Sequence, residues 1–397
     1  MRELNKTLAR KLYRFTIISV FILVFITNLF SEDIRCEWTG VERIVAVGDL
    51  HGDYDNFIEI LKDPEIGILD DNLRWIAGKT HLVQIGDIMD RGPDAKKIFV
   101  LLKRLEGEAE ESGGKVHMLI GNHEEMNISD IAFDRRGYVS VEQLMSFLPE
   151  EYIEKEERKI RKRLKIPSSD EGDSKSEINP NIRAFWEEKI RNSMNVTLPT
   201  RRHVRWHYRR EFNKNYAPWI LQHNAAIKIN GIIFVHGGIS EKYSTWPLQR
   251  LNDRLRKELE MFRVARLLGR EPRPTYEIVF DENGPLWYRD YSYRGPEFEP
   301  ILDKILKNLG ATSIVTAHTP RPLENEAEMS RYSGKVWIID TNISSVYPQG
   351  KLSALIIESS GKPHFKPWLK SRTGEEASTH VDDKSEDLRL IVLLTQN

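Results

Sequence analysis

Five short apolar runs, each ending in a polar or glycine-rich cluster, constrain this chain more than any other feature of its sequence. The runs are rich in β-branched residues, and segments of helical period separate them. They occupy residues 42–47, 80–85, 115–120, 231–235 and 312–317. This alternation predicts an α/β layered architecture. Because ligands gather beyond the strand ends of such sheets, we expect the five clusters to converge although they are scattered along the chain.

Length and composition fit one large, elaborated domain. Of the 397 residues, 40% are hydrophobic and 30% are charged, which is typical of a globular protein and not of a polytopic membrane protein. The formal net charge is −1, so the basic footprint that nucleic-acid binding requires is missing. We expect the main domain to span residues 42–360. A C-terminal tail, residues 371–397, is polar except for an apolar stretch at 388–394, which adds a strand or is disordered.

The N-terminal segment, residues 1–31, carries five basic residues followed by an apolar run of sixteen, from Phe15 to Phe30. This run is slightly longer than a usual signal h-region and shorter than the ~20 residues that span a bilayer. We interpret it as an export signal, with an uncleaved membrane anchor as the alternative. We therefore expect a periplasmic or extracytoplasmic protein, or one anchored to the inner membrane. Cys36 is the only cysteine, which excludes an intrachain disulfide and a thiolate metal cluster.

A charge-dense stretch, about residues 128–220, separates the third and fourth runs. Its charge spacing predicts an exposed helix over residues 150–165, and a second helix follows over 182–194. A basic, aromatic segment occupies residues 201–211, and a further helix is predicted over 247–268. We interpret the stretch as a helical insertion. Two roles stay open for it: a cap that selects substrates, or a solvated helical excursion.

Residue types that bind metals and phosphate follow the first two runs. The first cluster, GDLHGD, presents Asp49 and His51, a carboxylate and an imidazole that can share one divalent cation. The second cluster, GDIMDRG, presents Asp87, whose carboxylate is suited to bridge two metal ions. It also supplies Asp90, a second carboxylate, and Arg91, a guanidinium suited to bidentate phosphate contact.

The other three runs are followed by amide and imidazole groups. GNHE supplies Asn122 and His123, HGG begins with His236, and AHTP contains His318. Each motif alone is common at turns and helix caps, but all five in order after five strands predict one functional site. The mixed nitrogen and oxygen donor set, with no thiolate, favours Mn, Fe or Zn over Ca.

These motifs resemble those of the metallophosphoesterases, and specifically of the phosphoprotein phosphatase family, whose pattern runs GDxHG, GDxVDRG, GNHE, HGG and a late His. Met89 stands where Val is usual, and Asp53 stands where phosphatases of the eukaryotic type usually have Gln. The segments GDLHGDYD, GNHEEMN, FVHGGIS and GPLWYR are more narrowly similar to the bacterial-type Shewanella-like phosphatases. The resemblance covers about residues 43–358. It implies the calcineurin-like fold, a central β-sandwich flanked by helices.

The resemblance also implies a role for each motif residue. Two divalent metal ions would share a bridging water, whose acidity they raise for in-line attack on phosphorus. His123 would act as the general acid, oriented by Asp90, and Arg91 and Arg289 would bind the phosphate oxygens. The residues that the resemblance assigns to the first ion are Asp49, His51 and the bridging Asp87, and those assigned to the second are Asp87, Asn122, His236 and His318.

The implied activity is hydrolysis of a phosphomonoester on Ser, Thr or Tyr of a protein or peptide. A small phosphoester is an alternative substrate. Hydrolysis of dinucleoside polyphosphates is the nearest alternative activity, but enzymes of that group typically lack the aspartate that Asp90 supplies here. An inactive metal-binding scaffold is the last alternative. All the metal-ligand and dyad positions are filled, which favours an active enzyme.

Overall fold

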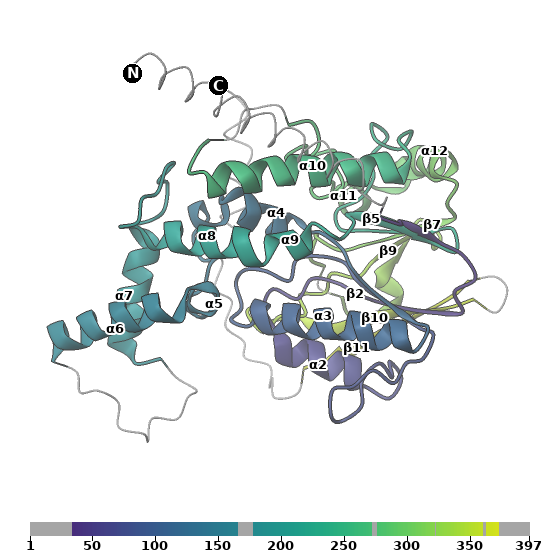
Figure 1. The fold of residues 1–397 in the computed structure, drawn as a ribbon. Helices are drawn as coiled ribbons and strands as arrows, with labels where there is room; N and C mark the ends of the chain where they lie inside the picture. The colour runs from purple at the N-terminus through teal and green to yellow at the C-terminus, as the bar shows by residue number, and fades with distance from the viewer. Residues whose placement is uncertain (1–33, 166–177, 272–275, 322, 360–362, 373–397) are drawn as a thin grey trace, which may run out of the picture.

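Two mixed β-sheets form the centre of the molecule, and helices cover their outer sides (Figure 1). The computed structural model describes residues 34–165, 178–271, 276–321, 323–359 and 363–372. The predicted signal or anchor segment and the apolar stretch of the C-terminal tail lie outside these ranges. Within them, no helix combines the length and the apolar character that a membrane crossing requires.

The five-stranded sheet holds the first three predicted strands. Its spatial order is β11 (His364–Ser371), β10 (Lys351–Glu358), β2 (Arg43–Val47), β3 (His81–Gln84) and β4 (Lys115–Met118). β2, β3 and β4 are parallel, and β10 and β11 are antiparallel to their neighbours. Four consecutive residues of β2, Ile44 to Val47, are fully buried, as expected for a strand that is covered on both faces. Because β11 belongs to this sheet, the sheet extends beyond residue 360, where the main domain was expected to end.

The six-stranded sheet holds the other two predicted strands. Its spatial order is β1 (Glu37–Trp38), β5 (Ala226–Ile229), β6 (Ile232–Val235), β7 (Ser313–Thr316), β9 (Val336–Ile338) and β8 (Ser330–Arg331). A parallel bridge between Leu119, just after β4, and Asn224, just before β5, links the two sheets. Apolar side chains of both sheets belong to one buried core. The predicted α/β class and the flanked β-sandwich are therefore confirmed.

The helices group by the sheet or helix that they cover. α2 (Tyr54–Lys62) packs on β10 and α3 (Ala95–Glu111) packs on β4, both at the five-stranded sheet. α10 (Leu248–Leu267) packs on β5, and α11 (Asp290–Tyr293) and α12 (Glu299–Leu309) lie on the same side of the molecule (Figure 1). Three short 3₁₀ helices are also described: η1 (Ala132–Asp134), η2 (Pro296–Phe298) and η3 (Glu326–Met329).

The insertion is helical, and only part of it is an excursion. Its helices are α5 (Val141–Phe147), α6 (Glu150–Leu164), α7 (Pro180–Arg191), α8 (Val204–Asn215) and α9 (Ala217–Ile220). α6 and α7 pack on each other and project from the body (Figure 1). α8 instead packs against α10 and against α4 (Asn122–Ser129), and its Tyr208 and Phe212 are buried. The core therefore extends into the insertion through α8.

A buried histidine pair lies where β1 meets the strands β3 and β4. Nε2 of His117 lies 3.0 Å from Nδ1 of His81, and Trp38 packs edge-on against both rings. Burial lowers the pKa of His81 to about 4, helped by the positive charges of Lys115 and Arg35. Burial and the neighbouring His81 also hold the pKa of His117 well below its ordinary value. The folded protein therefore keeps the pair neutral at pH values where an unfolded chain binds protons.

This pair should make the protein less stable in weak acid. Below pH ~6.5 the two histidines bind protons in the unfolded chain but stay neutral in the folded protein, so the free energy of unfolding falls as the pH drops toward 4. We expect His117→Asn to reduce the loss of unfolding free energy between pH 7 and pH 5 by up to about 2 kcal/mol. Denaturant unfolding at the two pH values measures this difference. The exposed His364 gives the control. Between pH 7 and pH 5, the His364→Asn variant should lose as much unfolding free energy as the wild type. An equal loss in the His117→Asn variant would contradict the expectation.

Candidate active site

The ends of β2, β3, β4, β6 and β7 bring the five predicted clusters together in one buried centre. Two sets of three side chains have ligand atoms within 4.8 Å of one another, and Asp87 belongs to both sets. One set adds His51 and His123 to Asp87, and the other adds His236 and His318. Asn122 adjoins the second set, since its Oδ1 lies 2.8 Å from Nε2 of His236. The convergence expected from the strand ends is thus observed.

The turns that present these side chains have an unusual backbone. Asp87, Asp90 and Arg91 have φ values of 54°, 71° and 72°, in the left-handed region that residues other than glycine rarely adopt. Such conformations persist only where the surrounding structure holds them. Glycines let the turns touch, because a Cβ added to Gly86 would lie 2.6 Å from the backbone nitrogen of Gly121.

The buried carboxylate of Glu124 joins the turn after β3 to the turn after β4. It accepts hydrogen bonds from the backbone N–H groups of Asp87 at 2.9 Å, Ile88 at 2.9 Å and Met89 at 3.2 Å. It also accepts the N–H of Gly121 at 2.9 Å, at the start of α4. In addition, Oδ1 of Asp87 accepts the backbone N–H of His123 at 2.9 Å. These bonds fix the backbone on which Asp87 and Asn122 stand.

The set around His236 has the chemistry of a cation site. Nδ1 of His236 donates to the carbonyl of Ile85 at 2.8 Å, so Nε2 presents a lone pair. That nitrogen faces Oδ1 of Asn122 at 2.8 Å, Nδ1 of His318 at 3.1 Å and Oδ1 of Asp87 at 3.2 Å. Such a convergence of acceptors repels unless a positive charge lies among them. Nε2 of His318 is also buried without a hydrogen-bond partner among the described residues. The set therefore fits a divalent metal ion.

Burial and neighbouring charges shift the pKa values of the site residues. Burial acts to raise the pKa of Asp87, but the neighbouring His236 and His123 outweigh it and hold the pKa well below the ordinary value. Burial, aided by Arg289, lowers the pKa of His318, and burial likewise lowers that of His51. The centre therefore presents an ionised Asp87 carboxylate and neutral imidazoles at His51 and His318, which are the ligand forms of these groups. At His236 the negative charge of Asp87 outweighs burial and raises the pKa of the imidazole.

Asp49 has a carboxylate neighbour that the sequence reasoning missed. Asp49 is buried beside Asp340, and burial together with Asp340 and Asp87 raises the pKa of Asp49 well above its ordinary value. Burial likewise raises the pKa of Asp340 to about 6. Oδ1 of Asp49 accepts the backbone N–H of His318 at 3.3 Å, so Asp49 reaches the centre although it belongs to neither set of three. Asp340 lies just beyond β9, at a strand end like the other clusters, but β9 has only three residues and gave no signal in the sequence.

His123 and Asp90 form a buried hydrogen-bonded pair. Nδ1 of His123 lies 2.8 Å from Oδ2 of Asp90, which leaves Nε2 directed toward the centre, 3.8 Å from Oδ2 of Asp87 in the set that both residues share with His51. His51 lies edge-on to the same ring, with 4.6 Å between ring centroids, and its Nδ1 bonds the carbonyl of Met89 at 3.0 Å. The pair thus has the arrangement of a general acid with an orienting carboxylate.

Arg91 stands between two aromatic rings that the sequence reasoning did not find. Its guanidinium carbon lies 4.9 Å from the ring centroid of Tyr138 and 5.2 Å from that of Tyr347. The rings orient the guanidinium and leave its N–H groups for an anion, and Nε has no partner among the described residues. Arg289 reaches the same region, where its Nη1 donates to the carbonyl of His318 at 3.0 Å and to Oγ1 of Thr319 at 3.1 Å.

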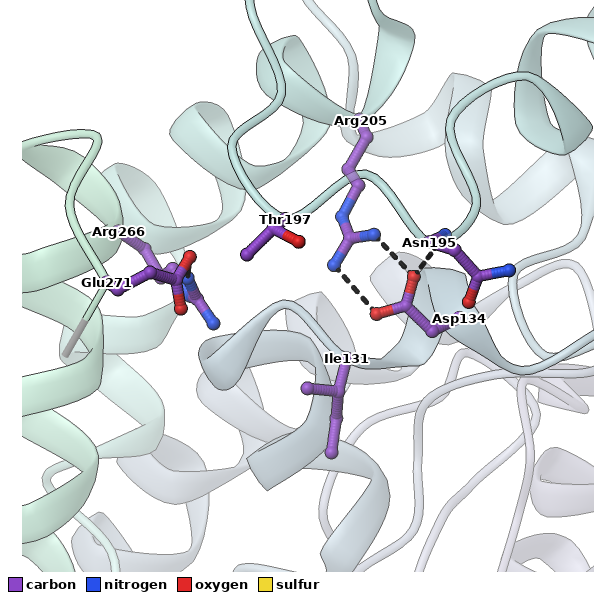
Figure 2. Close-up of a pocket in the computed structure, with 7 residues that line it drawn as sticks. All are labelled: Ile131, Asp134, Asn195, Thr197, Arg205, Arg266 and Glu271. Carbon is purple, nitrogen blue, oxygen red and sulfur yellow. Dashed lines mark hydrogen bonds and ion pairs between the residues drawn. The ribbon is translucent and has the colours of Figure 1, made fainter. Parts of the chain in front are cut away.

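A separate polar hollow of about 340 Å³ lies at the far end of α4 (Figure 2). Arg205 and Asp134 form one ion pair on its wall, and Arg266 and Glu271 form another on the opposite side. Its charges are mutually paired, and none of the predicted site residues lines it.

The sequence pattern of the calcineurin-like phosphoesterases matches residues 42–322. The chain therefore belongs to this family, and it is a phosphoester hydrolase. The resemblance of its motifs to the metallophosphoesterases is confirmed.

Several relatives are phosphatases by name. Shewanella-like protein phosphatase 2 of Arabidopsis thaliana is 30% identical, over 66% of this chain and 61% of the relative. Shewanella-like protein phosphatase 1 of Plasmodium berghei is 24% identical, over 80% of this chain and 71% of the relative. An uncharacterised protein of Schizosaccharomyces pombe is 27% identical, over 82% and 80%. Among solved structures, a cold-active protein-tyrosine phosphatase of a Shewanella species matches with a TM-score of 0.54 and 23% identity, covering 86% of this chain and 85% of that one. This likeness shows the fold.

The metal content of variants should distinguish the proposed role of Asp87 as a metal ligand from the proposed role of His123 in proton transfer. Asp87→Asn removes the carboxylate common to both sets, and we expect it to lower bound metal from about two ions per chain to nearly none. His123→Gln removes a side chain that we assign to proton transfer, and it should keep the metal. Elemental analysis of the purified variants after loading with Mn measures both. Full metal content in Asp87→Asn would contradict the bridging assignment.

Proposed function

We propose that the chain is a metal-dependent protein phosphatase that hydrolyses phosphomonoesters on Ser, Thr or Tyr side chains. The observation that carries the proposal is the buried pair of His123 and Asp90, whose imidazole belongs to one of the two sets that share Asp87. The two Shewanella-like protein phosphatases among the relatives support it. Small phosphoesters and dinucleoside polyphosphates remain substrates to compare in the assay.

We infer that two divalent ions, Mn, Fe or Zn, bind at the centre. When bound, such a pair raises the acidity of a shared water and stabilises negative charge on phosphoryl oxygens. The residues that would hold the first ion are Asp49, His51 and Asp87, and those that would hold the second are Asp87, Asn122, His236 and His318. Two ring nitrogens, Nδ1 of His51 and Nδ1 of His236, bond backbone carbonyls, which orients each ring with Nε2 toward the centre.

The chain's own residues would bind phosphate and move the proton. Arg91, oriented by its two rings, offers a fork of N–H groups to two phosphate oxygens. Arg289, which donates a hydrogen bond to the carbonyl of His318, would add a second positive charge. His123 would donate its Nε2 proton to the leaving alkoxide, while Asp90 holds Nδ1 and so fixes the direction of Nε2.

The location of the protein follows from the N-terminal segment, and we retain it as a proposal. A basic stretch followed by sixteen apolar residues favours export or anchoring at the inner membrane. The substrate would then be a phosphorylated protein or peptide outside the cytoplasm, or a small phosphoester there.

A phosphate-release assay tests this function. Residues 32–397, stripped of metal and then supplied with Mn, should release phosphate from phosphoserine, phosphothreonine or phosphotyrosine peptides. His123→Gln should lower kcat for a phosphoserine peptide by about 10²- to 10⁴-fold, the usual contribution of a general acid. Cleavage confined to diadenosine tetraphosphate would favour the alternative enzyme, and no turnover with any metal would favour the inactive scaffold. Near-normal turnover in His123→Gln would contradict the proton-transfer assignment.

A further inference from the structure

We propose that the helical insertion positions the catalytic pair through two residues that lie outside the five motifs, Gln143 of α5 and Tyr208 of α8. The inference rests on the proposed function and deepens it. Both side chains are buried, with exposed fractions of 0% and 1%. Neither contacts the metal-binding sets directly, so each is a positioning residue that acts through Asp90.

Gln143 holds Asp90 by its backbone and by its carboxylate at once. Oε1 of Gln143 accepts the backbone N–H of Asp90 at 2.6 Å, and Nε2 donates to Oδ1 of the same residue at 2.8 Å. Asp90 has a left-handed backbone, with φ of 71°, which its surroundings must hold in place. Gln143 itself is fixed at the start of α5, where its N–H bonds Oγ of Ser140 at 3.1 Å.

Tyr208 completes a closed network around the same carboxylate. Its hydroxyl donates to Oδ1 of Asn127 at 2.8 Å and accepts from Nε2 of Gln143 at 3.1 Å. Nδ2 of Asn127 then donates to Oδ1 of Asp90 at 3.0 Å and to the carbonyl of His123 at 2.9 Å. Every polar atom of the Asn127 and Gln143 side chains is bonded, so the network has one arrangement. It leaves Oδ2 of Asp90 for Nδ1 of His123.

α8 also holds the other end of α4, the helix that begins with Asn122 and His123. Arg205, three residues before Tyr208, donates to the carbonyl of Asp130, and its Nε lies 3.0 Å from Oδ1 of Asp130. Arg205 also pairs with Asp134, as Figure 2 shows. One face of α8 thus contacts α4 in its last turn, at Asn127, and just past its end, at Asp130. The insertion acts as a clamp on the helix that carries the general acid.

Removal of the Tyr208 hydroxyl should impair proton donation more than phosphate binding. Without it, Oδ1 of Asn127 loses its donor and Nε2 of Gln143 loses one acceptor. The two amides that bind Oδ1 of Asp90 are then held less firmly, and so is the Asp90 carboxylate. A general acid matters most for a poor leaving group such as the serine alkoxide, and little for p-nitrophenolate, which leaves without protonation. A defect in the pair therefore slows the phosphoserine peptide selectively.

The test compares kcat and KM of the Mn-loaded protein on a phosphoserine peptide and on p-nitrophenyl phosphate. For Tyr208→Phe we expect kcat on the peptide to fall about 10-fold, with KM and p-nitrophenyl phosphate turnover within about 2-fold of the wild type. Gln143→Met should show the same selectivity with a larger fall. His123→Gln sets the upper limit. Metal content and melting temperature show that each variant is folded and loaded.

Tyr216→Phe is the matched control, because Tyr216 caps the same helix and no hydrogen bond of its hydroxyl occurs among the described contacts. It should match the wild type on both substrates. Equal slowing of both substrates by Tyr208→Phe and Gln143→Met, or no slowing of either, would overturn the inference while the proposed function stands. A wild type that releases phosphate from neither substrate would overturn the proposed function itself.

Discussion

The centre depends on the carboxylate of Glu124, which is buried and accepts four backbone N–H groups from two turns. Those turns hold Asp87 in a left-handed conformation and begin the helix of Asn122 and His123. The N–H groups offset part of the cost of burying this carboxylate, although burial and the neighbouring Asp87 still raise its pKa. One buried side chain thereby aligns Asp87, the proposed bridging carboxylate after β3, with Asn122 and His123, the proposed amide ligand and general acid after β4.

The second level of support comes from outside the two sheets. Gln143 and Tyr208 bind Asp90 and its neighbour Asn127, while the ring of Tyr138 and the ring of Tyr347 hold Arg91. The contacts of Tyr138, Gln143 and Tyr208 give the insertion a buried part beside the site, in addition to the two roles that its sequence leaves open. Its projecting helices α6 and α7 take no part in these contacts. A single stretch of sequence thus combines a buried clamp and an exposed hairpin.

The sequence predicts the parts of this site that rest on local chemistry. Strand ends, turn glycines and metal-binding residue types are visible in order along the chain, so the five clusters and their convergence were predictable. The supporting contacts were not. Tyr208 lies in a basic, aromatic segment that reads as a solvated face, and its hydroxyl meets Asn127 only because α8 packs on α4. Asp340 follows a strand of three residues, too short to stand out.

A crystal structure of the Mn-loaded chain with bound phosphate tests the central claim most directly. We predict two anomalous-scattering peaks, one on each side of the Asp87 carboxylate, with phosphate oxygens on Arg91 and within hydrogen-bond reach of Nε2 of His123. A metal-loaded crystal with one peak, with metal away from Asp87, or with phosphate bound elsewhere would contradict the account.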